Sequence, residues 1–448
     1  MIRTAAAFFC VAFAVSAQID DATRRLSRDI FRELIEINTT DSAGDNTAAA
    51  RAMQKRFLDA GFPAADIKLL APPDRPNKGN LIVRLHGRTG STLKPIVILG
   101  HLDVVEAKRE DWTTDPFQFV EKDSYFYGRG TQDIKQGDAA LVTTMLRFKR
   151  EGFVPSRDII LALTSDEEGG TANGVEWLLK NHRDLLDAAF VLNVDAGGVY
   201  MEKGKPVSVE VGATEKIYAD FQLTVTNPGG HSSIPVADNA IYHLAEALAR
   251  LSHTPFPAEL NPVTKAYFEK VKPSETDPRS NALMHTTCVP TRLNAGHANN
   301  ALPQTAQANV NCRILPGHSP EEIRLKLVEI LADPKLQVRY ANGADGKAYD
   351  HAPEAKGAPP SMPVPEVLKP LQVVADSLWP GAPVIVAMET GASDGKYFQA
   401  LGIPTYGIGE FAVEKSDIRA HGKDERLPVD SFYQGVDFFY RYLKQVVR

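Results

Sequence analysis

Acidic and imidazole side chains stand directly after apolar runs of this sequence, at places where buried strands are expected to end. The groups of interest are His101, Asp103, Asp133, Glu167, Glu168, Asp195 and His421. In open α/β sheets, ligands bind just beyond the carboxyl ends of the strands, so these side chains are candidates for one shared site. Nitrogen and oxygen donors without cysteine suit Zn²⁺ or a similar divalent ion, so the residue types predict a metal centre.

The spacing within two of these clusters predicts separate roles. Asp103 stands two residues after His101, where a carboxylate can accept the second ring N–H of a metal-binding histidine and fix its tautomer. Asp166, Glu167 and Glu168 are three adjacent carboxylates, which repel one another unless a cation is near. Because adjacent side chains diverge, one glutamate can bind a metal while its neighbour faces the substrate as a general base.

Each cluster also has an ordinary structural explanation when it is taken alone. Asp133 stands near Gly130, and Asp195 stands shortly before a pair of glycines, as in many turns. A single histidine such as His421 is more often a surface residue. The metal-centre hypothesis therefore depends on the whole constellation.

The order and wording of these motifs resemble the M20 family of metallopeptidases. The matching stretches are GHLDVV (100–105), YGRGTQDIKQG (127–137), TSDEEGG (164–170), NPGGHSS (227–233), NCRILPG (311–317) and ETGASDGKYF (389–398). The resemblance spans residues 25–448 and is greatest to the dipeptidase and carboxypeptidase-S-like members.

The resemblance implies two Zn²⁺ ions per subunit, with Co²⁺ or Mn²⁺ as substitutes, and a water that bridges them. The implied ligands are His101, Asp133 and Asp195 for one ion, and Asp133, Glu168 and His421 for the other. By the same resemblance, Glu167 is the general base, Asp103 orients His101, and the peptide bond after Asp133 is cis.

The resemblance also implies the residues that contact the substrate. His231 would reach the active site of the partner subunit in a homodimer and stabilise the oxyanion. Asn300 and Arg313 would contact the carboxylate of the substrate, which the planar guanidinium group can bind through two hydrogen bonds. Gly391 and Ser393 lie in a glycine-rich loop that would bind the same end of the substrate.

The elements that must position these residues alternate along the first half of the chain. Apolar strands are expected at 80–85, 95–99, 158–163 and 189–194, and helices at 25–37, 46–60, 137–150 and 171–180. This alternation predicts an α/β fold, in which a mostly parallel sheet is covered by helices on both faces. By the resemblance, this α/β unit is expected to be a zinc-exopeptidase-like catalytic domain.

The pattern changes near residue 212. Residues 216–226 alternate between apolar and polar side chains, which is typical of a half-buried antiparallel strand. With helices at 238–251 and 320–332 and strands at 282–293, 305–315 and 336–340, this part predicts an α+β sandwich. We therefore expect a discontinuous catalytic domain, residues 18–211 and 345–448, with an inserted domain at 212–344 that serves as a lid and, by the resemblance, for dimerisation.

The N-terminus has the features of a secretory signal peptide, expected over residues 1–17. Arg3 is followed by an apolar run from Ala5 to Val15 and by the small-residue pattern Val15-Ser16-Ala17. This run is too short to span a bilayer, so the mature chain is expected to be periplasmic or secreted and not membrane-bound. It would retain Cys288 and Cys312, which can pair in an oxidising compartment or remain as two buried thiols.

Composition and missing motifs exclude other functions. The 448 residues contain 50 basic and 56 acidic side chains, so no basic excess favours nucleic-acid binding. The patterns H-E-x-x-H, G-x-S-x-G and G-x-G-x-x-G are absent, and the S-x-x-K match at Ser393–Lys396 lacks its partner motifs. The sequence thus predicts an exported di-zinc exopeptidase acting on dipeptides or short peptides. The alternatives are an N-acyl-amino-acid amidohydrolase or carboxypeptidase on the same fold, and a non-catalytic binding protein.

Overall fold

The apolar runs of the sequence form a central mixed sheet in the computed structural model, which describes residues 19–274, 276–341 and 347–448. The predicted signal peptide at 1–17 lies outside the described residues. The strand order is β1-β2-β6-β3-β7-β17-β9-β8-β18, with β16 paired to β9. These strands are β1 (Ile67–Leu70), β2 (Asn80–Leu85), β3 (Ile96–His101), β6 (Ile159–Thr164), β7 (Val191–Asn193), β8 (Gly198–Glu202), β9 (Lys205–Glu215), β16 (Val384–Glu389), β17 (Thr405–Gly407) and β18 (Ala412–Glu414).

The middle of this sheet is parallel. β3 pairs in parallel with β6 and β7, and β7 pairs in parallel with β17. Antiparallel pairs lie to either side, where β2 joins β6 and β8 joins β9. β3 and β6 are buried along their whole lengths, because helices cover both faces of the sheet. The predicted α/β class with a mainly parallel sheet is confirmed.

Helices form a layer on each face. One core joins the sheet to α1 (Asp21–Glu36), α2 (Asn46–Asp59), α3 (Lys135–Glu151), α9 (Pro365–Leu378) and α11 (Val429–Val446). The opposite core involves α4 (Gly174–Asn181) and α10 (Gly395–Ala400). α3 ends one residue beyond the predicted end at 150. Gly152 adopts a left-handed φ of 63° there and caps the last turn.

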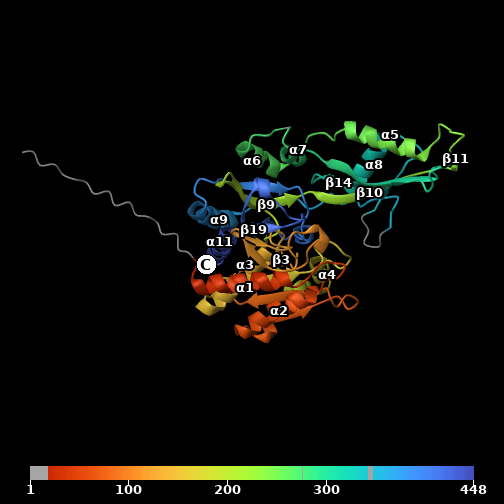
Figure 1. Ribbon diagram of the computed structural model, residues 1–448. Helices are drawn as coiled ribbons and strands as arrows, with labels where there is room; N and C mark the ends of the chain where they lie inside the picture. Colours follow the sequence, from red (N-terminus) through yellow and green to blue (C-terminus); the bar gives the residue numbers. More distant parts are fainter. Residues whose placement is uncertain (1–18, 275, 342–346) are drawn as a thin grey trace, which may run out of the picture.

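Residues 217–352 have a core of their own. A four-stranded antiparallel sheet, ordered β12-β14-β10-β15, is covered on one face by two helices. The elements are β10 (Ile217–Thr226), α5 (Ala240–His253), β12 (Thr287–Ala295), β14 (Thr305–Ile314), α8 (Pro320–Leu331) and β15 (Gln337–Tyr340). Buried and less buried residues alternate along β10, as predicted for residues 216–226, and they also alternate along β14. Figure 1 shows this inserted unit above the catalytic sheet and helices; its boundaries at 212 and 344 stay a prediction.

Two helices were not predicted. α6 (Pro262–Lys270) and α7 (Pro278–Met284) begin at Asn261 and Asp277, whose side chains accept hydrogen bonds from the first helical turn, and each has proline as its first residue. The capping signals were in the sequence, but both helices are short. They pack around β16 of the catalytic sheet, although they fall within the predicted insertion.

Short elements complete the described chain. They are η1 (Ala64–Asp66), η2 (Arg109–Asp111), η3 (Arg183–Leu185), η4 (Lys415–Asp417), β4 (Val120–Lys122), β5 (Tyr125–Tyr127), β11 (Gly230–His231), β13 (Ala301–Leu302) and β19 (Arg426–Pro428). β5 pairs with β19, which places the segment before Asp133 beside the segment after His421. Within the described residues, no helix is both long and apolar enough to cross a membrane.

A disulfide bond joins Cys288 to Cys312. The two cysteines stand directly opposite each other in β12 and β14, so the structure decides the alternative that the sequence left open. The bond ties the edge strand β12 to its neighbour within the inserted unit. It closes a loop with a sequence separation of 24 residues.

Removing this cross-link is expected to destabilise the inserted unit. Closing a loop of this size restricts the unfolded chain and typically stabilises a protein by about 2–4 kcal/mol. The double variant Cys288→Ala/Cys312→Ala should therefore unfold at a lower denaturant concentration, measured by circular dichroism. Reduced wild-type protein is the control and should unfold at the same midpoint as the double variant. Equal midpoints for the variant and the oxidised wild type would contradict a stabilising role.

Candidate metal centre and active site

The topology of the sheet brings the predicted metal ligands to one edge. His101 is the last residue of β3, the Glu167–Glu168 pair follows β6, and Asp195 follows β7. These three strands are parallel neighbours, so their carboxyl ends meet at the same edge. Asp133 lies shortly before α3, and the peptide bond between Asp133 and Ile134 is cis, as the resemblance implied.

Asp133 lies between two histidines. His101 Nε2 is 3.3 Å from Asp133 Oδ1 and 3.7 Å from Asp195 Oδ1. His421 Nε2 is 3.0 Å from the other oxygen, Asp133 Oδ2, and 3.0 Å from Glu168 Oε2. The two oxygens of one carboxylate thus face two different imidazoles, as a ligand that bridges two cations would require.

The donor atoms fit divalent cations. Oxygen and nitrogen atoms of His101, Glu167 and Asp195 gather within 4.8 Å of one another, and so do those of His101, Asp133 and Glu168. His101 Nε2 and Asp133 Oδ1 are buried without a hydrogen-bond partner among the described residues. Burial raises the pKa of Asp195 to about 7. Such a concentration of buried carboxylates is stabilised by bound cations.

Asp103 connects the first histidine to the acidic turn. His101 Nδ1 lies 3.7 Å from the carboxylate of Asp103 and 3.0 Å from its backbone oxygen, so Nε2 remains directed at the cluster. The carboxylate of Asp103 also accepts the backbone N–H groups of Glu167 and Glu168, at 3.1 and 2.9 Å. Asp103 therefore contacts His101 through its backbone oxygen and not, as the sequence predicted, through a hydrogen bond to its carboxylate. Its orienting role stays a prediction.

The structure separates the three adjacent carboxylates. Asp166 adopts a positive φ of 57° and pairs with the buried ammonium group of Lys78. Glu168 lies against His421, at 3.0 Å. Glu167 lies within the cluster that contains His101 and Asp195. The acidic run thus contains one structural residue and two residues that face the candidate metal site.

Glu425 was missed by sequence reasoning. Its buried carboxylate accepts the backbone N–H groups of Gly130, Gln132 and Asp133, and it pairs with Arg129 at 2.6 Å. It therefore holds the loop that presents Asp133. The only signal in the sequence was an acidic residue four positions after His421, which by itself is indistinguishable from a surface charge.

The glycine-rich loop reaches the site, but one of its predicted contacts is used internally. Ser393 donates its backbone N–H and its hydroxyl to Glu215, at 2.9 and 2.8 Å, and it is 5% exposed. Its hydroxyl thus shapes the loop, while Gly391 faces open space. Asp394, a second residue missed from the sequence, accepts a hydrogen bond from Asn173 at 2.6 Å.

The remaining predicted contacts lie in the inserted unit. His231 and Asn300 are neighbours, because Ser232 N donates to the backbone oxygen of Asn300. Figure 1 shows β11, which carries His231, at the end of the inserted unit farthest from β3. Arg313 lies on the open face of the inserted sheet with its guanidinium group 4.6 Å from the centre of the Tyr218 ring. Within this chain, the structure does not bring these three residues into the metal cluster.

Residues 97–445 match the sequence model described as peptidase family M20/M25/M40. The chain belongs to this family. The resemblance seen in its motifs is confirmed, and the chain is a metal-dependent hydrolase of the peptidase and amidohydrolase kind. The second alternative, a non-catalytic binding protein, is therefore not supported.

Relatives of this M20 chain include hydrolases of two kinds. "Probable carboxypeptidase S-like 2" of Dictyostelium discoideum is 30% identical over 383 residues, which cover 79% of this chain and 72% of the relative. "N-fatty-acyl-amino acid synthase/hydrolase PM20D1" of Homo sapiens is 26% identical over 463 residues, covering 96% of this chain and 89% of the relative.

Solved structures share the fold. The M20 family metallo-carboxypeptidase Sso-CP2 from Sulfolobus solfataricus has a TM-score of 0.69 and 16% identity, covering 96% of this chain and 99% of that one. The dipeptidase Dug1p from Saccharomyces cerevisiae has a TM-score of 0.70 and 18% identity, covering 95% and 97%. At these identities the likeness shows the architecture of the M20 chain alone.

The two glutamates of this M20 chain are expected to respond differently to substitution. Glu168→Gln should lower the metal content by about one ion per chain, because Glu168 shares His421 with Asp133. Glu167→Gln should keep both ions but lower kcat by roughly 10²–10⁴, the usual contribution of a general base. Mass-spectrometric metal analysis and turnover of the same samples measure both. Loss of metal from both variants would show that Glu167 is a ligand instead.

Proposed function

We propose that this chain is an exported di-zinc exopeptidase that hydrolyses the amide bond of dipeptides or short peptides. The observation that carries the proposal is the position of Asp133, whose two oxygens face His101 and His421 separately. Asp195 and Glu168 complete a ligand set on either side. Glu167 lies beside the same cluster without being needed for the bridge.

The chain's own residues supply the proton transfer. When bound, two divalent ions polarise the carbonyl of the scissile amide and lower the pKa of water. The carboxylate of Glu167 then accepts the proton of the attacking water and passes it to the leaving nitrogen. Asp103 keeps Glu167 in position through the backbone N–H, and it keeps the Nε2 atom of His101 directed at the cluster.

The inserted unit supports recognition of a carboxylate at the end of the substrate. Arg313 lies in a concave surface on the open face of its sheet, together with Tyr218, Asn309 and Asn311. The Tyr218 ring holds the guanidinium group from one side, which leaves its N–H groups available to a planar carboxylate. A free α-carboxylate is present in both dipeptides and N-acyl amino acids, so this feature suits both substrate classes.

Hydrolysis of N-acyl amino acids is the second candidate. It is favoured by the relative named PM20D1, whose alignment covers 96% of this chain. The two candidates differ only in the group on the acyl side of the scissile bond. A comparison of zinc-loaded protein on free dipeptides, N-blocked dipeptides and N-acyl amino acids, with kcat/KM as the readout, separates them. Absence of turnover on all three classes would refute both.

The disulfide supports export, and a free strand edge with exposed apolar side chains supports a homodimer. The disulfide in the inserted unit suits an oxidising compartment, in agreement with the predicted signal peptide. β12 is an edge strand of its sheet in the described part of the chain, and its Leu293 is 66% exposed. Ile234, just after β11, is 72% exposed. Exposed apolar side chains and a free strand edge favour an isologous contact through the inserted unit.

Removing the proposed carboxylate contact should affect only substrates that carry the carboxylate. Arg313→Ala is expected to lower kcat/KM for free-acid peptides by about ten- to a hundred-fold, the equivalent of roughly 1.5–3 kcal/mol for a charge-assisted contact. C-terminally amidated analogues should be poor substrates of the wild type and little affected. Arg339→Ala, in β15 of the same sheet and paired with Asp350, is the matched control. Equal losses on acid and amide would show that Arg313 holds structure.

A shared active site predicts complementation between inactive subunits. His231→Ala and Glu167→Gln chains should each be inactive as homodimers. Mixed dimers should regain part of the activity, because one of their two sites would combine an intact His231 with an intact Glu167. Differently tagged chains, purified as heterodimers, provide the measurement. Heterodimers without activity would count against a contribution of His231 across the interface.

A further inference from the structure

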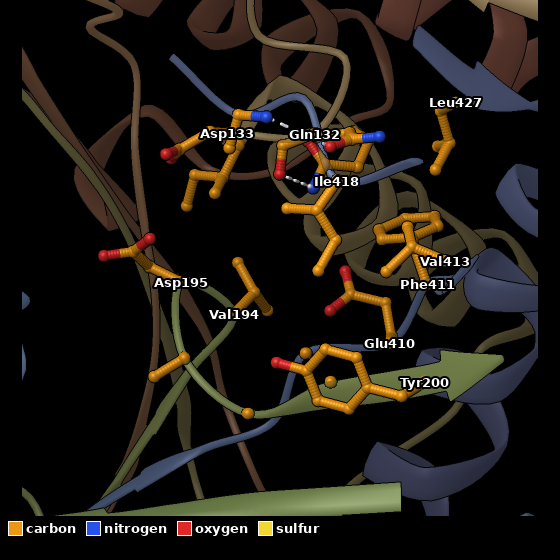
Figure 2. Close-up of a pocket in the computed structure, with 17 residues that line it drawn as sticks. Gln132, Asp133, Val194, Asp195, Tyr200, Glu410, Phe411, Val413, Ile418 and Leu427 are labelled. Atoms are coloured by element: carbon orange, nitrogen blue, oxygen red, sulfur yellow. Dashed lines mark hydrogen bonds between the residues drawn. The ribbon is translucent and has the colours of Figure 1, made fainter. Parts of the chain in front are cut away.

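A cavity of about 220 Å³ adjoins the metal centre and is lined by strands and loops of the catalytic unit and by the start of α3. Asp133 and Asp195 form part of its wall, and no residue of the inserted unit takes part. Figure 2 shows the carboxylates of Asp133 and Asp195 on one side of this cavity and Glu410 on the other. The cavity is smaller than the roughly 300 Å³ at which pockets for drug-sized ligands begin, so it suits a small group.

Glu410 is a buried carboxylate that the mechanism does not use. It lies between β17 and β18, it is 0% exposed, and both of its oxygens lack a hydrogen-bond partner among the described residues. Figure 2 shows its carboxylate directed into the cavity, toward Val194 and Ile418. Burial raises the pKa of this carboxyl well above its usual range. An unpaired carboxylate in such a place is unfavourable, and a bound cation would satisfy it.

The glycine at position 137 leaves space for this carboxylate. A side chain there would approach Glu410 Oε1 to 3.5 Å and Val194 to 2.8 Å, which is too close for the latter. Gly137 belongs to the first turn of α3. The carboxylate is thus accommodated where Gly137 brings the backbone of the helix after Asp133 close to it, while Gln136 of the same helix also lines the cavity.

The other walls of the cavity are mainly apolar. Ile134, Val194, Phe411, Ile418 and Leu427 line it together with Tyr200. Asp133 and Asp195 in the same wall are assigned to the metal centre, and the amide oxygen of Gln132 accepts backbone N–H groups. The oxygen donors that remain near Glu410 are fewer than the six or more that Ca²⁺ or Mg²⁺ takes. A primary ammonium group on an aliphatic chain matches both features, because its methylene groups pack on the apolar walls while its charge meets Glu410.

We propose that the Glu410 cavity binds an alkylammonium group, a primary amine carried on an aliphatic chain. The amine belongs to one of two kinds of molecule, a substrate or a free small amine. It can be the basic side chain or amino-terminated acyl chain of a substrate, which would make Glu410 a specificity-determining residue on the acyl side of the scissile bond. It can also be a free small amine that binds beside the metal centre. The first source rests on the proposed function, and the second does not.

Direct binding tests the site without requiring turnover. Isothermal titration of the zinc-loaded protein with n-pentylammonium chloride should show saturable binding, and 1-pentanol should bind much more weakly. Glu410→Gln keeps the shape of the side chain and removes its charge, so it should weaken amine binding about ten- to a hundred-fold, the range for a charge-assisted contact. Glu176→Gln, an identical change on an exposed helix position outside the cavity, should bind like the wild type.

Two matched substrates identify the source of the amine. N-(6-aminohexanoyl)-L-phenylalanine and N-heptanoyl-L-phenylalanine differ only in a terminal ammonium or methyl group. If the substrate supplies the amine, the wild type should prefer the amino compound about ten- to a hundred-fold in kcat/KM. Glu410→Gln should abolish this preference and leave kcat/KM for the heptanoyl compound unchanged.

The outcomes test the amine site at Glu410 independently of the proposed hydrolysis. Amine binding that depends on Glu410, with the substrate preference, supports the substrate as the source. The same binding without the preference supports a free amine. If neither compound is cleaved but the titration shows Glu410-dependent binding, hydrolysis of such N-acyl amino acids fails and the site stands. No binding by the wild type, or equal binding by Glu410→Gln, overturns the proposal.

Discussion

Mutual repulsion among buried carboxylates is the constraint on which the rest of this structure depends. Asp103, Asp133, Glu167, Glu168 and Asp195 approach one another at the carboxyl edge of the parallel strands. Without compensation, like charges in a poorly solvated place drive carboxyl groups to their neutral form. Two histidines supply part of the compensation, and the metal on which M20 hydrolases depend would supply the rest. Hydrogen bonds from the backbone hold the acidic groups in place.

Residues outside the candidate ligand set hold the ligand-bearing segments in place through defined contacts. Glu425 fixes the Asp133 loop through three backbone N–H groups, Asp103 fixes the Glu167–Glu168 turn through two, and Lys78 neutralises Asp166. Each of these contacts joins segments far apart in the sequence. Metal ligands that are held in this way keep their geometry when the metal exchanges, because the protein and not the ion determines their positions. Glu410 is different, since its charge has no such partner in the described chain.

In the proposed function, the division into two cores separates chemistry from recognition. The metal cluster lies on the rigid parallel sheet, whereas Arg313, Asn300 and His231 lie on a unit with its own core. β9 of the catalytic sheet and β10 of the inserted sheet are joined through Lys216 alone, whose buried ammonium group donates to the backbone oxygen of His285. If Arg313 binds the substrate carboxylate as proposed, the relative position of the two units determines how that substrate meets the metal centre.

The sequence by itself determined the strand–helix alternation, the strand-end positions of His101, Glu168 and Asp195 and the resemblance to M20 enzymes, because apolar periodicity and short motifs are local properties. Asp133 was also expected at a strand end, but it lies in the loop before α3. Only the tertiary structure decided that Asp133 divides its oxygens between two histidines, that Cys288 pairs with Cys312, and that Ser393 bonds to Glu215. It also revealed Glu425 and Glu410 as buried acids. Their roles depend on partners brought near by folding, or on the absence of a partner in the described chain, and local sequence encodes neither.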